Sequence, residues 1–335
     1  MIGQRGELLR GAFQRLQFWG LREDHRFVLL ASTKTHQPII DAFLGAASGL
    51  GAEPVLVVIP DRRPFSDIPS SAEQTLNAAD FIIDLQHLTW GYTPSHDRVV
   101  RSVRQRQAFY TAVGGMPEDI PHIIKCPPTE KYRARARRAQ ELIDGARTIH
   151  VTTGQGTDLK VARGDPRKLI AYPSPHFGQV AFAPPAGSAE GTIMFQGAVR
   201  IQAPDPQTFH VFEPFRIDLR DGRITEIDRR NSWAHFLADW FASFDAPAAY
   251  QFAHINIGLD ERASLVQIDN MSVHFRAGGV LMGFGINWTP LFGTPPVDGV
   301  LNHVDMHLVH VNYFADNVQL VADGRLTDVL NEGGN

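Results

Sequence analysis

The sequence is poor in cysteine, with only Cys126 among 335 residues. A single cysteine excludes an intrachain disulfide, and it excludes zinc and iron–sulfur sites built from several thiolates. Any metal site in this chain would therefore have to use histidine and carboxylate ligands.

Long hydrophobic runs and an excess of one charge are also missing. No stretch of about 18 consecutive apolar residues occurs, and residues 1–20 mix arginines with apolar residues, unlike a signal peptide. With 32 basic and 36 acidic side chains, the formal net charge is only -4, which gives no argument for a nucleic-acid or anionic-membrane partner. We expect a soluble cytoplasmic protein that acts on a small molecule.

The glycine-rich motifs of nucleotide-binding proteins are missing as well. The first predicted strand is followed by STKTHQP (32–38), where GxGxxG or GxxxxGK[ST] would be needed for a dinucleotide or a nucleotide. A GxSxG motif, which marks the nucleophile of many serine hydrolases, does not occur either.

The first part of the chain alternates predicted strands and helices. Short apolar runs at 26–33, 55–60 and 80–85 are separated by segments with helical spacing, and this pattern predicts an open parallel α/β domain. An arginine-rich helix at 129–146 is expected to close this domain and to expose its arginines to solvent. We therefore place the N-terminal domain at residues 1–146.

From residue 147 the pattern changes to alternating polar and apolar residues with DG and GG turn pairs, which predicts antiparallel strands and hairpins. One helix interrupts them at 232–244. Residues 147–335 are thus expected to form a β-rich domain, and the predicted fold class is α/β plus α+β.

The strongest candidate for a metal site is the segment LNHVDMHLVHVNYFADN (301–317). His303 and Asp305 are two residues apart, so on a strand they project from one face. His307 extends this face, whereas His310 is expected to face away. A polar strand without a metal remains open as the alternative.

Other histidines could complete such a site. His254 lies in an apolar segment, and a buried imidazole needs partners for both ring nitrogens. His274 adjoins Arg276, whose charge opposes a nearby cation, so we do not expect it to be a ligand.

Two further histidines are candidates for acid–base catalysis. His176 lies in a loop restricted by prolines. His87 follows the third parallel strand, where open α/β domains usually carry function, and it shares its loop with Thr93 and His96. The sequence does not choose among them.

Several segments, in this order, resemble the metallo-aminopeptidases of the aminopeptidase T type and their relatives, the iron-dependent 2,5-dihydroxypyridine 5,6-dioxygenases. The segments are HVTTGQGTDLKVA, FGQVAFAPPAGSAEGTIMFQG, AHINIGLDERA, VLMGFGIN, HVDMHLV and VADGRL. The resemblance covers nearly the whole chain.

The resemblance implies that the peptidase ligands are incomplete. Where the aminopeptidases have two glutamates and a histidine, this chain has Gln179, His254 and Leu281. The His-x-Asp pair is retained in 303–305. This combination disfavours a two-metal peptidase.

The dioxygenase branch fits better, because it uses two histidines and an aspartate. Carried over by position, the resemblance implies His254, His303 and Asp305 as iron ligands, and His176 matches a further histidine of that branch. A glutamate of the branch has no clear counterpart here, Asp165 being the nearest carboxylate.

The leading hypothesis is therefore a mononuclear non-haem Fe(II) dioxygenase of the extradiol type that cleaves a hydroxylated N-heteroaromatic ring with O2. His254, His303 and Asp305 would bind the iron, and His176 or His87 would move a proton of the substrate. One alternative is a single-metal Zn or Mn hydrolase of an amide, peptide or cyclic substrate, and another is a metal-free binding protein on the same scaffold. A homo-oligomer is expected.

Overall fold

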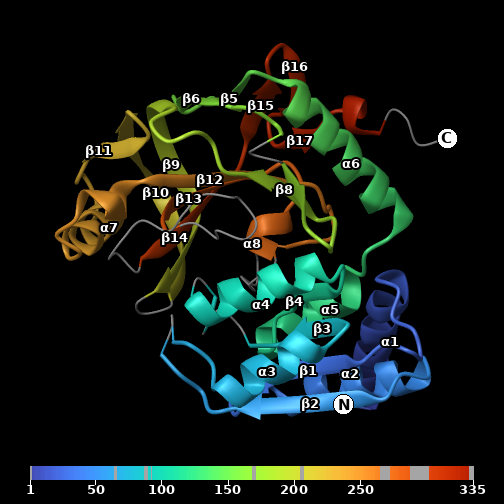
Figure 1. The fold of residues 1–335 in the computed structure, drawn as a ribbon. Coiled ribbons are helices and arrows are strands. Elements are labelled where there is room, and N and C mark those ends of the chain that lie inside the picture. Colours follow the sequence, from blue (N-terminus) through green and yellow to red (C-terminus); the bar gives the residue numbers. More distant parts are fainter. Residues whose placement is uncertain are drawn as a thin grey trace. The chain divides into compact units, whose positions relative to one another are not determined.

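The computed structural model describes residues 2–63, 66–86, 90–91, 93–167, 171–203, 207–264, 272–286 and 302–331. The chain forms two compact units (Figure 1). The first comprises Met1–Thr129 and Arg262–Ser272, and the second comprises Glu130–Glu261 and Val273–Asn335. The sequence placed the break after residue 146, but α6 (Glu130–Gly145) belongs to the second unit, where it contacts β7, β8 and η3.

The first unit contains a four-stranded parallel sheet in the order β2-β1-β3-β4, which confirms the predicted α/β domain. Its strands are β1 (Phe27–Ser32), β2 (Pro54–Ile59), β3 (Phe81–Asp84) and β4 (Phe109–Ala112). Its helices are α1 (Ile2–Phe18), α2 (Gln37–Gly49), α3 (Ser70–Ala78), α4 (Pro94–Gln105), η1 (Pro117–Asp119) and α5 (Ile120–Lys125). The sequence reading missed β4, whose four residues are too few for a clear pattern.

Helices cover both faces of this sheet, as a parallel sheet requires. On β1, Val28 and Leu30 pack into a core with α3 and α4, whereas Leu29 and Ala31 pack into a second core with α1, α2 and α5. The period of two along the strand thus divides its apolar side chains between two helical layers.

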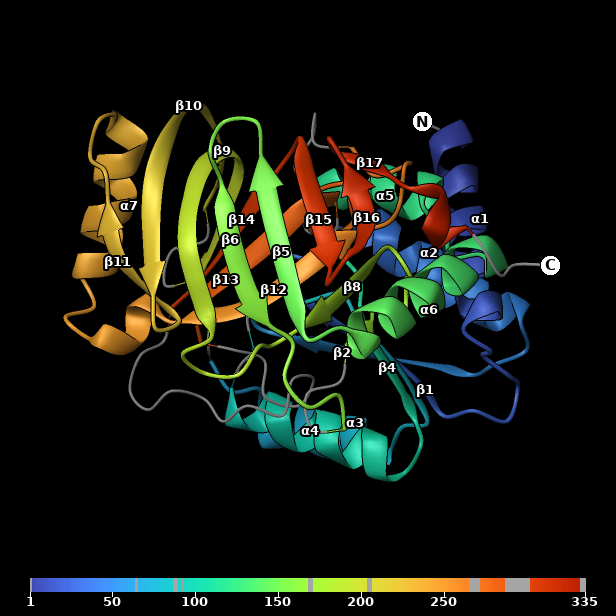
Figure 2. The same cartoon turned by 90° about the horizontal axis from the view of Figure 1, so that it is seen from above.

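The second unit is built on a 13-stranded sheet in the order β17-β16-β15-β5-β6-β9-β14-β13-β12-β8-β7, with β10 and β11 joined through β9. Figure 2 shows β10, β9, β6, β5, β15 and β16 side by side, with β14, β13 and β12 passing behind β9, β6 and β5 in this view. The strands are β5 (Thr148–Thr153), β6 (Asp158–Ala162), β7 (Tyr172–Pro173), β8 (Gln179–Phe182), β9 (Ala189–Ala203), β10 (Gln207–Arg220), β11 (Arg223–Ile227), β12 (Phe252–Gly258), β13 (Val280–Gly285), β14 (His303–Leu308), β15 (Val311–Ala315), β16 (Val318–Ala322) and β17 (Arg325–Leu326). Its further helices are α7 (Ser232–Ala242), η2 (Pro247–Tyr250), α8 (Ser272–Phe275) and η3 (Asp328–Leu330).

The strand pairings described in this sheet are antiparallel, as the alternation predicted. Two DG pairs among the described residues also behave as expected: Asp221 and Gly222 both have positive φ, and so do Asp323 and Gly324. Two adjacent residues with positive φ give the type I′ turn that suits the twist of a hairpin.

Two expectations about helices are corrected. Residues 272–275 lie in the region where the alternating pattern predicts strands, but they form the short helix α8. Arg135 of α6 was expected to be solvated, but it is only 4% exposed. Its buried guanidinium is satisfied by hydrogen bonds that Nη1 donates to the Leu259 carbonyl (2.8 Å) and to Glu261 Oε1 (2.7 Å). Among the described residues, no helix combines the length and the apolar character needed to cross a membrane.

Candidate metal centre

The centre of the large sheet brings the predicted ligands together. Strands β12, β13 and β14 are neighbours, and every residue in each of them is buried. The register aligns His254 with Gly283 and Gly283 with Asp305. Residues in register project to the same face of a sheet. His254 and Asp305 therefore lie on either side of Gly283, which has no side chain.

The functional atoms of three side chains converge there. His254 Nε2 and His303 Nε2 each lie 3.3 Å from Asp305 Oδ1. Candidate ligand atoms of the three residues all lie within 4.8 Å of one another. His303 and Asp305 are fully buried and His254 is 5% exposed, so the group is shielded from bulk water.

A backbone contact of His303 indicates what this group can bind. Its Nδ1 lies 2.7 Å from the Ile286 carbonyl oxygen, which can only accept, so Nδ1 carries a proton and donates it. A neutral ring then keeps its lone pair on Nε2, the atom that faces Asp305 Oδ1. Two lone-pair atoms this close in a dry site repel each other unless a proton or a metal cation lies between them. Two imidazole nitrogens and one carboxylate oxygen fit a divalent transition metal.

Gly283 provides the space for this arrangement. A Cβ atom at that position would lie 2.2 Å from His254 Cε1 and 2.5 Å from His254 Nδ1. Any side chain at 283 would therefore displace the imidazole of His254.

Neighbouring groups keep Asp305 ionised. Burial raises the pKa of its carboxyl, but the nearby imidazoles of His303, His254 and His274 outweigh burial and hold that pKa well below its ordinary value. Burial also lowers the pKa of His254, which Asp305 only partly offsets. A carboxylate beside neutral imidazoles is the protonation state that a metal needs.

The second oxygen of Asp305 has partners of its own. The side-chain amide of Gln202 donates to Oδ2, and His274 Nε2 lies 3.3 Å from the same oxygen. Sequence reasoning set His274 aside because of Arg276. It missed Gln202 entirely, since no spacing in the sequence links Gln202 to Asp305.

His176 is buried against the residue that follows His274 in the chain. It is 4% exposed, and its ring centroid lies 5.6 Å from that of Phe275, which follows His274 in α8. Gly178 permits this packing, because a Cβ there would come within 2.4 Å of Phe275 Cγ.

The remaining histidines of 301–317 differ in their surroundings. His307 is buried on the same strand, against Gly279. The side chain of His310 is 80% exposed in a turn, so it faces away from the buried centre as expected.

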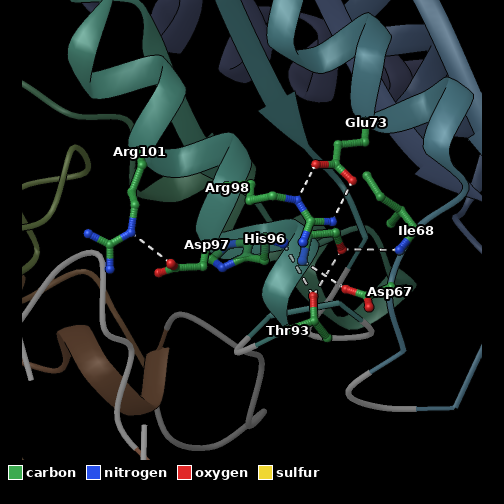
Figure 3. Close-up of polar contacts among 9 residues, drawn as sticks. Asp67, Ile68, Glu73, Thr93, His96, Asp97, Arg98 and Arg101 are labelled. Atoms are coloured by element: carbon green, nitrogen blue, oxygen red, sulfur yellow. Dashed lines mark hydrogen bonds and ion pairs between the residues drawn. The ribbon is translucent and has the colours of Figure 1, made fainter. Parts of the chain in front are cut away.

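The loop that was expected to carry His87 is described only in part, and His87 itself lies outside the described residues. The structure gives Thr93 and His96 structural contacts at the start of α4 (Figure 3). Thr93 Oγ1 accepts from the backbone N–H of His96 (3.3 Å), which caps the helix. His96 Nε2 lies 3.2 Å from the Tyr110 hydroxyl.

Comparison with known proteins gives a consistent result. A family profile described as 2,5-dihydroxypyridine 5,6-dioxygenase matches residues 7–328. A 2,5-dihydroxypyridine 5,6-dioxygenase of Pseudomonas putida KT2440 is 27% identical over 275 residues, which are 76% of this chain and 73% of the relative.

Two solved structures share the fold. The 2,5-dihydroxypyridine dioxygenase from Pseudomonas putida KT2440 superposes with a TM-score of 0.77 and 22% identity, covering 96% of this chain and 97% of that one. Wild-type AmpT from Thermus thermophilus superposes with a TM-score of 0.64 and 14% identity, covering 96% and 99%.

Proposed function

The chain belongs to the 2,5-dihydroxypyridine 5,6-dioxygenase family, and from this membership we propose that it is an Fe(II)-dependent dioxygenase of the extradiol type. Its proposed substrate is a hydroxylated N-heteroaromatic ring similar to 2,5-dihydroxypyridine, which it cleaves with O2. The observation that carries the proposal is the approach of His254 Nε2 and His303 Nε2 to one oxygen of Asp305.

Two histidines and one carboxylate suit this chemistry, because they occupy half of an octahedral coordination sphere. Fe(II) bound by His254, His303 and Asp305 would supply open positions for a chelating substrate and for O2. The contribution of the chain is to hold the three ligands on adjacent strands, to orient His303 through the Ile286 carbonyl and to exclude bulk water by burial.

Proton transfer needs a further side chain. We assign it to His176, which would accept the proton of a substrate hydroxyl through a ring nitrogen. Its burial against Phe275, next to His274, supports this assignment. His87 is the alternative.

A hydrolase with two metals receives less support from the same residues. Gln179, at the position where aminopeptidases are expected to have a glutamate, accepts a hydrogen bond from Asn256 Nδ2 at Oε1 (2.6 Å). Leu281 is buried and apolar. Neither side chain can replace an anionic or imidazole ligand of a second metal.

The proposal is tested with purified protein loaded with Fe(II) under anaerobic conditions. On admission of O2 and 2,5-dihydroxypyridine, we expect stoichiometric oxygen consumption and loss of the ultraviolet band of the substrate. Asp305→Asn should lower the affinity for the metal by at least about 10- to 100-fold and abolish turnover. His310→Ala, which changes an exposed histidine of the neighbouring turn, should leave both unchanged. Turnover with Zn(II) in the absence of O2 would instead establish a hydrolase.

A further inference from the structure

Gln202 occupies an irregular position in the sheet. Strand β9 pairs with β14 through His303 opposite Ala203 and Val304 opposite Ile201, so one step along β14 corresponds to two steps along β9. Gln202 is thus the extra residue of a β-bulge. Bulges redirect a side chain and occur frequently beside active sites.

The side chain of Gln202 reaches Asp305. Gln202 is 4% exposed and Asp305 is fully buried, and the amide N–H of Gln202 donates to Asp305 Oδ2. His274 Nε2 approaches the same oxygen, whereas His254 and His303 approach Oδ1. The two oxygens of one carboxylate therefore have separate sets of partners.

We propose that Gln202 is a positioning residue that makes Asp305 a monodentate metal ligand. A carboxylate can bind a metal through one oxygen or through both. With Oδ2 held by the Gln202 amide, only Oδ1 is presented to the metal, and the coordination position that Oδ2 would occupy stays open for substrate or O2. The inference rests on the proposed metal site and extends it to a residue that would not touch the metal.

An amide is suited to this task. It donates a hydrogen bond without carrying a charge, so it neither repels the metal nor neutralises the carboxylate. Its position on strand β9, between Ile201 and Ala203 that both pair with β14, limits its movement.

The test compares Gln202→Met and Gln202→Asn with the unchanged protein. Methionine keeps the volume without the donor, and asparagine keeps the amide but shortens its reach by one methylene. Gln196→Met is the matched control on the same strand, because Gln196 donates to the Phe212 carbonyl (2.8 Å) instead. Thermal unfolding of the metal-free proteins identifies any variant that does not fold.

The readouts are the dissociation constant for Co(II), measured by competition with a chelator, and the visible spectrum of the Co(II)-loaded protein. Both Gln202 variants should bind Co(II) about 10- to 100-fold more weakly than the unchanged protein. Their d–d bands should also differ from those of the unchanged protein, because Oδ2 would replace a solvent ligand of the metal. The control should match the unchanged protein in both measurements.

Two outcomes would overturn the inference, and they can be told apart. If the unchanged protein binds Co(II) but folded Gln202 variants keep its affinity and spectrum, the positioning role is wrong and the metal site stands. If the unchanged protein binds neither Co(II) nor Fe(II), the metal site is wrong and the positioning role fails with it.

Discussion

At the scale of single residues, the sequence predicted the polar side chains that meet but not the groups that orient them. The spacing of two between His303 and Asp305 on a strand already implies a shared face. Which oxygen of Asp305 faces the histidines depends on Gln202 and His274, which come from other segments and meet Asp305 only after folding. No local pattern could have indicated these contacts.

Gly283 provides a direct test at this scale. Gly283→Ala should push the His254 ring from its place, because the new Cβ would overlap Cε1 and Nδ1. We expect about 1–3 kcal/mol of destabilisation from overpacking and a loss of metal affinity of about 10- to 100-fold. Denaturant unfolding and chelator competition measure the two effects.

Gly154→Ala is the control, because no heavy atom within 4 Å surrounds a Cβ at that position. If Gly283→Ala left the metal affinity unchanged, the imidazole of His254 would not need its present position to bind the ion.

At the scale of elements, strand type was predictable and strand order was not. Alternation and DG turns correctly indicated antiparallel strands after residue 147. That β12, β13 and β14 lie next to one another depends on pairings between segments that are distant along the chain. A one-residue shift in the register of β12 would turn His254 to the other face of the sheet. Four-residue elements such as α8 and β4 are too short for a periodic signal.

The end of β3 carries a buried carboxyl group with a testable pH dependence. Asp84 is 2% exposed and accepts hydrogen bonds from Trp90 Nε1 (2.7 Å), the Tyr110 hydroxyl (2.9 Å) and the Gln86 backbone N–H (2.8 Å). Burial raises its pKa from 3.8 to about 6, although these hydrogen bonds partly oppose the shift.

Between pH 4 and about 6 the folded protein therefore holds a proton at Asp84 that the unfolded chain has released. Stability falls with rising pH wherever the folded state binds more protons. The shift corresponds to about 3 kcal/mol of unfolding free energy lost across this window.

The measurement compares unfolding free energies of the unchanged protein and Asp84→Asn from pH 4 to pH 6.5. The unfolding free energy of the unchanged protein should exceed that of Asp84→Asn most at pH 4, and this difference should shrink as pH rises. A difference between the two proteins that stays constant with pH would contradict the raised pKa.

At the scale of the whole molecule, composition and pattern were sufficient for the fold class. The change from alternating strands and helices to hairpins correctly predicted a parallel α/β unit and a β-rich unit. The sequence could not assign α6, because the apolar face of a helix does not reveal which sheet it covers. Its contacts with β7, β8 and η3 place it in the second unit.

All three proposed ligands belong to the second unit, so metal binding should stabilise that unit. A ligand that binds only the folded state adds about 2.7 kcal/mol when its free concentration is 100 times the dissociation constant. Addition of Fe(II) or Co(II) to metal-free protein should therefore raise the unfolding temperature, and a chelator should reverse the rise. Hydrogen exchange should slow in β12, β13 and β14, the strands that carry His254, His303, Asp305 and the intervening Gly283. Asp305→Asn should lose both responses to the metal; if it keeps them, the stabilising ion binds elsewhere in the chain.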